Sequence, residues 1–275
     1  MIYLIVASIE GREKYLKKFI SSIKNTNTVE KYKIVIVRQY KEELFSFKDD
    51  RIKFINIKDF GASNARNLGL NFIKNKIKET DWVCFPDDDC YFNKNLLKLL
   101  LKYQNYDLVF GDIRDPDDKF RMGLPVHSKN SKLRKSFPVI NCPSFFVKAS
   151  KIHNFKFNEY YGPGAVIPAV EETEFLYRLS QIENLNCIYS SEIKIFHPYE
   201  QMSYEQAYRY AYSQGVLLKK ILKNKNFLLF LTYFKYLCRP FFAFVIKIIF
   251  LFSISKFYKV RCMGLLSGFF SGVEH

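Results

Sequence analysis

The sequence predicts an α/β protein with a mostly parallel sheet flanked by helices, followed by a helical C-terminal tail. Short apolar, β-branched runs alternate with segments whose apolar residues recur at helical spacing, which is the pattern of βαβ units. A basic, aromatic segment of different composition then ends the chain. At 275 residues the chain has room for one full domain and an appendage. We therefore assign residues 1–222 to the main domain and 223–275 to the tail.

The elements of the main domain follow from these patterns. Apolar runs predict strands over residues 2–7, 34–37, 52–57, 82–85 and 108–110. Helical spacing predicts helices over residues 15–23, 62–78, 94–103, 171–181 and 204–222. A loop rich in Gly and Pro, residues 161–168, precedes the fourth of these helices and is of a kind that more often positions a ligand than fills a core.

The charge of the chain is concentrated in its tail. Lys and Arg outnumber Asp and Glu by 43 to 27, and from Lys219 onward the only acid is Glu274. The basic residues there alternate with apolar runs at 227–231 and 248–252, which favours a membrane surface with anionic headgroups over nucleic acid. We expect no nucleic-acid partner, because the rest of the chain shows no basic aromatic platform.

The tail is predicted to lie on a membrane rather than to cross it. Its longest apolar stretch, residues 240–255, is interrupted by Lys247 and is shorter than the roughly 20 residues that a spanning helix needs. Two alternatives stay open: the tail packs back onto the main domain, or it forms a homodimer interface.

The first residues and the cysteines indicate the compartment. Residues 1–9 lack a basic region and are too short for a secretory signal, so they are predicted to form a strand, and we expect the protein in the cytoplasm. The six cysteines include no CxxC pair, which argues against a zinc site or a thioredoxin-like motif.

Three consecutive acids, Asp87, Asp88 and Asp89, directly follow a predicted buried strand. In extended backbone, residues two apart point to the same side, so Asp87 and Asp89 are expected to converge while Asp88 faces away. Ligands bind at the carboxyl ends of strands in open α/β sheets, and two carboxylates there suit Mg²⁺ or Mn²⁺ shared with a diphosphate. The alternative is a solvated turn that caps the next helix.

Two further segments carry candidate site residues. The small-residue segment from Gly61 to Gly69 opens a predicted helix, with Ser63 as its expected cap and Arg66 facing a phosphate or a carboxylate. The acidic segment 171–174 opens another helix, where carboxylates are favoured by the helix dipole. Because that segment follows the Gly/Pro loop, one of its glutamates is also a candidate general base for an attacking hydroxyl.

In their order and spacing these segments resemble glycosyltransferase family 2. The sequence from Phe85 to Cys90 resembles the Asp-x-Asp element of the family, and Gly61 to Gly69 resembles the motif that precedes it. Residues 161–165 with 171–175 are similar to the acceptor loop and the motif of the catalytic base. Residues 187–189 and 195–197 resemble a strand pair that ends in a histidine near the metal, and 208–215 fit the helix that follows.

The resemblance implies a GT-A-type nucleotide-diphospho-sugar transferase fold and an inverting, metal-assisted glycosyl transfer in surface-polysaccharide biosynthesis. It implies Mn²⁺ or Mg²⁺ as cofactor, a nucleoside-diphosphate sugar, with a UDP-sugar favoured, as donor, and a saccharide as acceptor. The basic, aromatic tail favours a lipid-linked saccharide. The implied catalytic base is Glu172, with Glu171 as the rival, and the implied metal ligands are Asp87, Asp89 and His197. The implied donor contacts are Ala7, Ser8, Gln39, Gly61, Arg66, Asp87 and Asp88, and the implied acceptor contacts are Gly162, Gly164 and Glu171.

Two positions depart from the family pattern. Glu172 stands where most members have aspartate, and the second strand ends in Arg38 and Gln39 where an aspartate pair usually contacts the nucleotide base. The second departure leaves the donor base open, although the amide of Gln39 is able to bind uracil or another pyrimidine. Two other functions fit an acid cluster on such a sheet: a nucleotidyltransferase, and a non-catalytic membrane-bound module that binds sugar nucleotides or polysaccharides.

Overall fold

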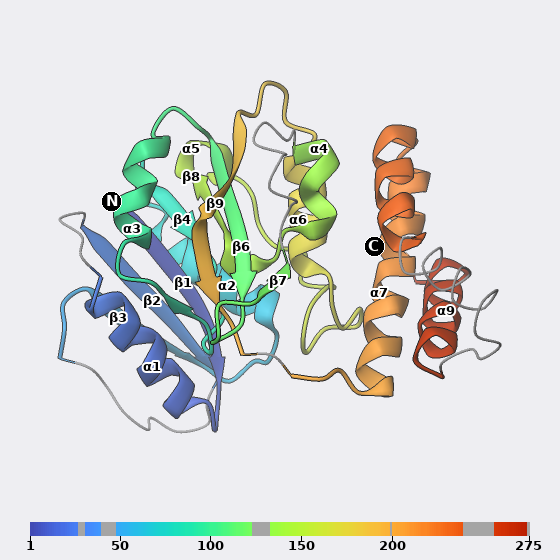
Figure 1. Ribbon diagram of the computed structural model, residues 1–275, viewed down its shortest axis with the longest axis horizontal. Coiled ribbons are helices and arrows are strands. Elements are labelled where there is room, and N and C mark those ends of the chain that lie inside the picture. Colours follow the sequence, from blue (N-terminus) through green and yellow to red (C-terminus); the bar gives the residue numbers. More distant parts are fainter. Residues whose placement is uncertain (27–30, 40–47, 123–132, 199, 239–255, 274–275) are drawn as a thin grey trace.

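A computed structural model describes residues 1–26, 31–39, 48–122, 133–198, 200–238 and 256–273. Its centre is one sheet with the strand order β3-β2-β1-β4-β8-β6-β9-β5, and β7 pairs with β6 beside this path. Helices lie on both faces of the sheet, and α7 and α9 stand at one end of the molecule (Figure 1). This arrangement confirms the α/β class predicted from the sequence.

The first half of the sheet is parallel, as predicted. It consists of β1 (Ile2–Ile9), β2 (Tyr32–Gln39), β3 (Ile52–Ile57) and β4 (Trp82–Cys84). All neighbouring pairs in this half are parallel. Because parallel strands end at the same edge, the residues that follow β1, β2 and β4 come together there.

The second half of the sheet is mixed. The strand β8 (Phe145–Lys148) runs antiparallel to both β4 and β6 (Leu108–Arg114), whereas β9 (Cys187–Phe196) is parallel to β6. The short β5 (Tyr91–Phe92) and β7 (Phe120–Met122) add antiparallel edges. The two strands expected at 187–189 and 195–197 are one continuous strand, β9, because both halves pair with the same neighbour, β6.

The helices divide the core into two clusters. One face of the sheet packs against α1 (Glu13–Lys24) and α3 (Leu96–Leu99), and the other against α2 (Ala62–Ile73) and α6 (Glu171–Leu179). Shorter helical segments are α4 (Leu133–Ser136) and α5 (Ala149–Ile152), with the 3₁₀ turns Leu100–Tyr103, Phe137–Val139 and Cys142–Ser144. The predicted helix 94–103 is thus an α-helical turn that continues as a 3₁₀ turn.

The helix α2 differs from its prediction at both ends. It ends at Ile73 instead of 78, and a following turn, in which Ile77 donates its amide hydrogen to the Ile73 carbonyl, keeps Ile77 on the core. Ser63 does not cap the helix; Gly61 is the N-cap residue, and the Ser63 hydroxyl donates to the Tyr161 carbonyl at 2.6 Å. Gly69 packs closely against the sheet, because a Cβ there would lie 2.3 Å from Cγ2 of Ile5.

The described part of the tail packs on the main domain. The helix α7 (Tyr204–Lys223) packs along α9 (Lys256–Phe269) at glycines, and a Cβ on Gly268 would lie 1.9 Å from the Tyr212 carbonyl. The helix at 227–238 follows α7 and precedes α9 in the sequence. It buries Leu229 and Tyr233 in the domain core. Its opposite side exposes large apolar side chains: Phe227, Leu228, Leu231 and Phe234.

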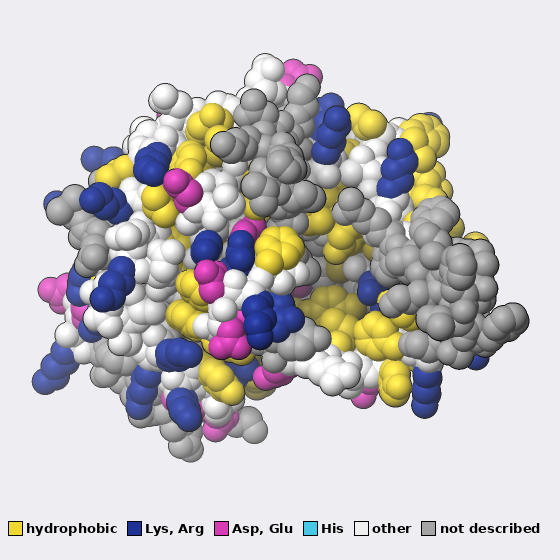
Figure 2. Space-filling view, viewed as in Figure 1, with side chains coloured by type: hydrophobic (Ala, Val, Ile, Leu, Met, Phe, Trp, Pro, Cys, Tyr) yellow, Lys and Arg dark blue, Asp and Glu magenta, His cyan; other side chains and the backbone are white. Residues whose placement is uncertain are grey.

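Hydrophobic side chains gather at the end of the molecule where Figure 1 draws α7, and Lys and Arg lie beside them (Figure 2). Within the described ranges, no helix has the length and apolar character needed to cross a bilayer. The apolar stretch 240–255, with Lys247, lies outside the described residues.

Candidate active site

A cavity of about 910 Å³ lies at the carboxyl edge of the parallel half of the sheet. Most of the site residues expected from the sequence line it together: Ala7, Gln39, Gly61, Arg66, Asp87, Asp88, Asp89, Gly164, Glu171, Glu172 and His197. Two expected residues, Ser8 and Gly162, do not line it. The Ser8 hydroxyl donates a hydrogen bond to Asp88, which does line the cavity. Gly162 lies close to Glu171, since a Cβ on this glycine would be 3.0 Å from the Glu171 carboxyl carbon.

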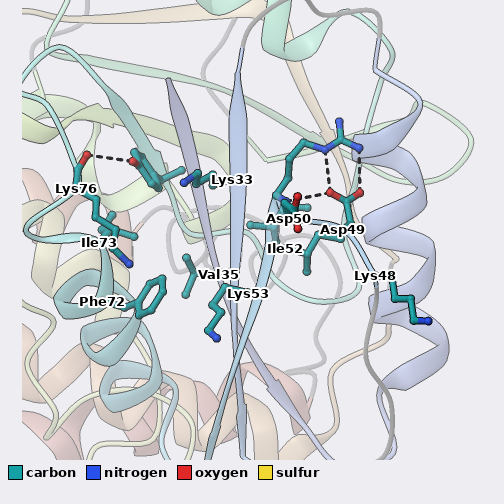
Figure 3. Close-up of a pocket in the computed structure, with 13 residues that line it drawn as sticks. Lys33, Val35, Lys48, Asp49, Asp50, Ile52, Lys53, Phe72, Ile73 and Lys76 are labelled. Atoms are coloured by element: carbon teal, nitrogen blue, oxygen red, sulfur yellow. Dashed lines mark hydrogen bonds and ion pairs between the residues drawn. The ribbon is translucent and has the colours of Figure 1, made fainter.

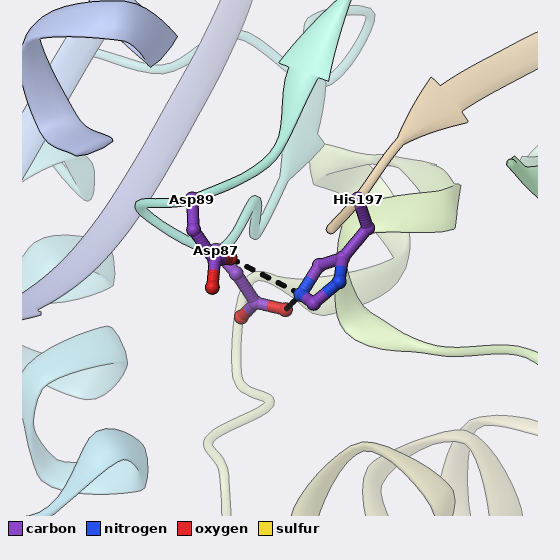
Figure 4. A group of neighbouring side chains, drawn as sticks. All are labelled: Asp87, Asp89 and His197. Carbon is purple, nitrogen blue, oxygen red and sulfur yellow. Dashed lines mark ion pairs between the residues drawn. The ribbon is translucent and has the colours of Figure 1, made fainter. Parts of the chain in front are cut away.

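Three ligand groups converge on one point of this cavity. Asp87 and Asp89 follow β4, His197 follows β9, and one side-chain donor atom of each lies within 4.8 Å of the others (Figure 4). His197 Nε2 is 3.1 Å from Asp89 Oδ1 and 3.9 Å from Asp87 Oδ2. The expected convergence of Asp87 and Asp89 is present in the structure.

The pKa values of His197, Asp89 and Asp87 depend on one another and on burial. Burial opposes ionisation of both His197 and Asp89, but their hydrogen bond and mutual attraction raise the pKa of His197 to about 9 and lower that of Asp89 to about 2. Burial raises the pKa of Asp87 above its ordinary value. In the protein without metal, His197 therefore carries a proton that a bound cation would replace.

Asp88 faces away from this point, as predicted, although it lies in a turn after β4 and not in extended backbone. It accepts hydrogen bonds from the Ser8 hydroxyl at 2.7 Å and from the Arg12 guanidinium at 2.7 Å. The same Arg12 nitrogen is 2.5 Å from Asp89 Oδ2. Arg12 thus holds two of the three consecutive acids in place. Arg12 was not predicted from the sequence; its position just after the first strand, at the ligand-binding edge, was the available signal.

The group Asp87, Asp89 and His197 fits a hard divalent cation. It offers carboxylate oxygens and one imidazole nitrogen from two separate strands, and these donors leave room for the phosphate oxygens that usually complete a Mg²⁺ or Mn²⁺ site. The positive charges of Arg12 and Arg66 beside the acids limit the net negative charge of the site.

The opposite wall of the cavity is built on a buried ion pair. Arg66 of α2 donates from Nη1 to Glu171 Oε1 at 2.8 Å and from Nη2 to Asp87 Oδ1 at 3.1 Å. Arg66 and Glu171 are both buried. Arg66 was expected to face a carboxylate, and it faces two, those of Glu171 and Asp87. Its guanidinium thus connects the acids after β4 with the start of α6.

Glu172 is the acid in this wall without such a cationic partner in the described part of the chain. It lines the cavity, and burial together with the neighbouring charge of Glu171 raises its pKa well above the ordinary value. The Cys142 thiol lies within 4.8 Å of both glutamates, and burial raises its pKa as well. A carboxyl with a raised pKa facing a cavity has the properties of a general base.

The Gly/Pro loop is joined to the start of α2. Ala62 donates its amide hydrogen to the Pro163 carbonyl at 3.0 Å, and a Cβ on Gly164 would lie 3.1 Å from Gly61 Cα. Gly164 also has a φ of 86°, a conformation that favours glycine. The loop therefore forms one rim of the cavity, as expected from its composition.

Several further lining residues were not found from the sequence. Among them are Ile9, Phe60 and Tyr210 of α7, which are 47%, 61% and 45% exposed. Phe60 directly precedes the glycine segment, which was a usable signal, whereas the contribution of Tyr210 depends on how α7 crosses the domain.

A second cavity of about 870 Å³ lies at the amino-terminal ends of β2 and β3 (Figure 3). Exposed lysines, including Lys33, Lys53 and Lys76, surround an apolar floor, and the Asp49–Arg51 ion pair closes one side. None of the site residues expected from the sequence lines it.

The family model for glycosyl transferase family 2 matches residues 4–144, just over half of the chain. The chain belongs to this family and is a glycosyltransferase. No curated protein sequence matches it.

Solved structures of S. aureus TarS are similar in fold. TarS 1-349 has a TM-score of 0.61 and 14% identity, covering 98% of this chain and 80% of that one. Its complex with UDP has a TM-score of 0.54 and 17% identity, covering 78% and 65%. Its complex with UDP-GlcNAc has a TM-score of 0.55 and 15% identity, covering 78% and 66%. The chain spans 39% of the longer TarS structure. These matches confirm the GT-A-type fold.

Proposed function

We propose that the chain transfers a sugar from a nucleoside-diphosphate donor to a hydroxyl of a saccharide acceptor with inversion at the anomeric carbon. The observation that carries this proposal is that Glu172 and the group Asp87, Asp89 and His197 line the same cavity from different elements. A base on one side and a diphosphate site on the other are the two parts that an in-line displacement at a sugar carbon needs.

In the proposed reaction the Glu172 carboxylate takes the proton of the acceptor hydroxyl. The hydroxyl oxygen forms a bond to the anomeric carbon while the bond from that carbon to the diphosphate oxygen breaks, and the nucleoside diphosphate leaves with the bonding electrons. Mn²⁺ or Mg²⁺, held by Asp87, Asp89 and His197, would neutralise charge on the diphosphate. Arg66 pairs with Glu171 at 2.8 Å, which leaves Glu172 as the carboxyl of this wall that is available to the acceptor hydroxyl.

The donor is proposed to be a nucleoside-diphosphate sugar, with UDP-sugars the first to test because the similar TarS structures hold UDP and UDP-GlcNAc. Sustained release of nucleoside diphosphate in the presence of a saccharide acceptor is the expected result of a donor panel with Mn²⁺. Release of pyrophosphate, as from a nucleotidyltransferase, or binding without turnover would contradict the proposal.

The acceptor is proposed to be lipid-linked, in surface-polysaccharide assembly at the cytoplasmic face of the plasma membrane. Support comes from the apolar side chains Phe227, Leu228 and Phe234, which are exposed on a helix of the basic tail. Apolar insertion and basic residues act together at an anionic surface, at about 1 kcal/mol for each Lys or Arg near the headgroups.

Vesicle flotation tests the membrane part separately. The full-length protein is expected to float with anionic vesicles and less with neutral ones, and Leu228→Gln with Phe234→Gln is expected to abolish flotation. The matched control is Leu101→Gln, an exposed apolar residue elsewhere on the domain. Flotation of the double variant equal to the wild type would contradict membrane binding through this helix and favour packing on the main domain or dimerisation. A concentration-dependent dimer that this variant dissociates would favour the homodimer alternative.

A further inference from the structure

The donor end of the cavity contains a side-chain amide whose orientation is fixed by the backbone. Gln39 is the last residue of β2, is 3% exposed, and lines the cavity. Gly61 donates its amide hydrogen to Gln39 Oε1 at 2.5 Å. Because the backbone N–H is a donor, the carbonyl oxygen of the side chain must face it, and the amino group must face the other way.

The partner of this bond is itself held firmly. Gly61 precedes α2, and the next residue, Ala62, donates to the Pro163 carbonyl at 3.0 Å. Gly164 lies close enough that a Cβ would be 3.2 Å from the Gly61 nitrogen. Gln39 cannot turn its amide without leaving the Gly61 N–H unpaired in a part-buried position, which is costly.

The amino group of Gln39 is left for a ligand. Within the described part of the chain, Nε2 forms no hydrogen bond, although the rest of the side chain is almost completely buried. A buried amide is normally satisfied on both sides, and a cavity-lining one that is satisfied on one side only has its other side available to what the cavity binds.

The surroundings of Gln39 suit a flat, weakly polar group. Ile9 and Phe60 are the exposed apolar residues on this side of the cavity, and Ile9 is paired with Gln39 across β1 and β2. A donor whose diphosphate binds at Asp87 and Asp89 would have this apolar end of the same cavity available for its base. The ring of Phe60 and the hydrogen-bond donor of Gln39 are the kinds of group that bind the face and the edge of a nucleotide base.

We infer that Gln39 reads the base of the donor by donating a hydrogen bond from Nε2 to an acceptor atom of the base, so that the site accepts cytosine at least as well as uracil. This inference rests on the proposed function. Cytosine offers N3 and O2 as acceptors, and uracil offers O2 and O4 but presents an N–H donor at position 3. A carboxylate at the same place would instead accept from the uracil N3–H and repel the cytosine N3.

Calorimetric titration with UDP and CDP in the presence of Mn²⁺ tests the inference. In the wild type, CDP is expected to bind as tightly as UDP or more tightly. The isosteric Gln39→Glu is expected to shift the ratio of the two dissociation constants toward UDP by about tenfold, the size of one hydrogen bond gained or lost. Gln201→Glu, an exposed position outside the cavity lining, is the matched control and should leave the ratio unchanged.

The outcomes separate the inference from the proposed function. If wild type prefers UDP by more than about tenfold, Gln39 does not read the base as inferred, whether or not the variant folds. An unchanged ratio in a folded Gln39→Glu protein leads to the same conclusion. If neither UDP nor CDP binds with Mn²⁺, the inference fails, whereas the proposed function fails only if no donor of the panel releases nucleoside diphosphate.

Discussion

Arg66, at the start of α2, and Glu171, at the start of α6, are 105 residues apart in the sequence and form a buried ion pair at 2.8 Å. This pair distinguishes the two adjacent glutamates. Glu171 is held by a guanidinium, whereas Glu172 lines the cavity with a raised pKa. This difference is the reason why we propose Glu172 as the base and keep Glu171 as its rival.

The two glutamates are expected to fail in different ways when changed to glutamine. Glu172→Gln should fold, bind donor and lose transfer by about a hundredfold or more, the usual contribution of a general base. Glu171→Gln should keep more activity but lower the free energy of unfolding by about 2 kcal/mol, because a hydrogen bond to a charged group is lost. Single-turnover kinetics and denaturant unfolding measure the two effects, with exposed Glu183→Gln as the control. The reverse ranking in activity would move the base to Glu171.

The acids after β4 are expected to bind a divalent cation weakly alone and well with a nucleoside diphosphate, because one or two carboxylates plus phosphate oxygens are the usual ligands of Mg²⁺ and Mn²⁺. Asp89→Ala should remove the Mn²⁺ dependence of nucleotide binding in calorimetry. Asp117→Ala changes an exposed aspartate outside the cavity and should have no effect. Mn²⁺-dependent binding that survives Asp89→Ala would refute the assignment of the metal site.

Cation binding is also expected to release a proton from His197. Its pKa is raised to about 9, so the imidazole is protonated at neutral pH and must lose that proton to coordinate a metal. The apparent Mn²⁺ affinity should therefore rise as the pH rises toward 9. Calorimetry at pH 7.5 in two buffers of different ionisation enthalpy should count about one proton released per ion, and none in His197→Gln.

The same histidine has an effect of opposite sign on the protein without metal. Because its folded pKa is above its ordinary value of 6.5, the His197–Asp89 pair stabilises the fold fully below pH 6.5, and this stabilisation is lost as the pH rises through about 9. The difference in unfolding free energy between wild type and His197→Gln should shrink over that range. A difference that is constant with pH would show that the pair contributes no charge-dependent stability.

The contact between α7 and α9 depends on Gly268. A Cβ there would lie 1.9 Å from the Tyr212 carbonyl, and backbone on both sides leaves no flexible side chain to move away. Gly268→Val is expected to separate α9 from α7, lowering the melting temperature and the hydrogen-exchange protection of residues 256–269. Gly272→Val is the matched control, since no atom lies within 4 Å of its added Cβ. Equal protection in both variants would mean that α9 does not require the close contact.

The sequence predicted those parts of the site that depend on local geometry. The expected convergence of Asp87 and Asp89, with Asp88 turned away, is present. It arises in a turn directly after β4, in which Cys90 donates its amide hydrogen to the Asp87 carbonyl, and not in the extended backbone from which it was predicted. The alternation of apolar runs with helical spacing likewise predicted the parallel half of the sheet. Both signals arise within a few residues of one another, so they are visible in a single sequence.

Other features depended on contacts between distant segments. Ser63 has the chemistry of a helix cap, but the Tyr161 carbonyl, 98 residues later, takes its hydroxyl. Arg12 reaches Asp88 and Asp89 only because β1 and β4 are neighbours in the sheet. The antiparallel insertion of β8 between β4 and β6 had no local signal either.

The chain by itself thus determined the family, the elements and the acids at the strand end, since these depend on local periodicity and motif order. Only the tertiary structure decided which charge pairs with which acid, and which face of Gln39 is left for a ligand, because these depend on the packing of elements far apart in the sequence.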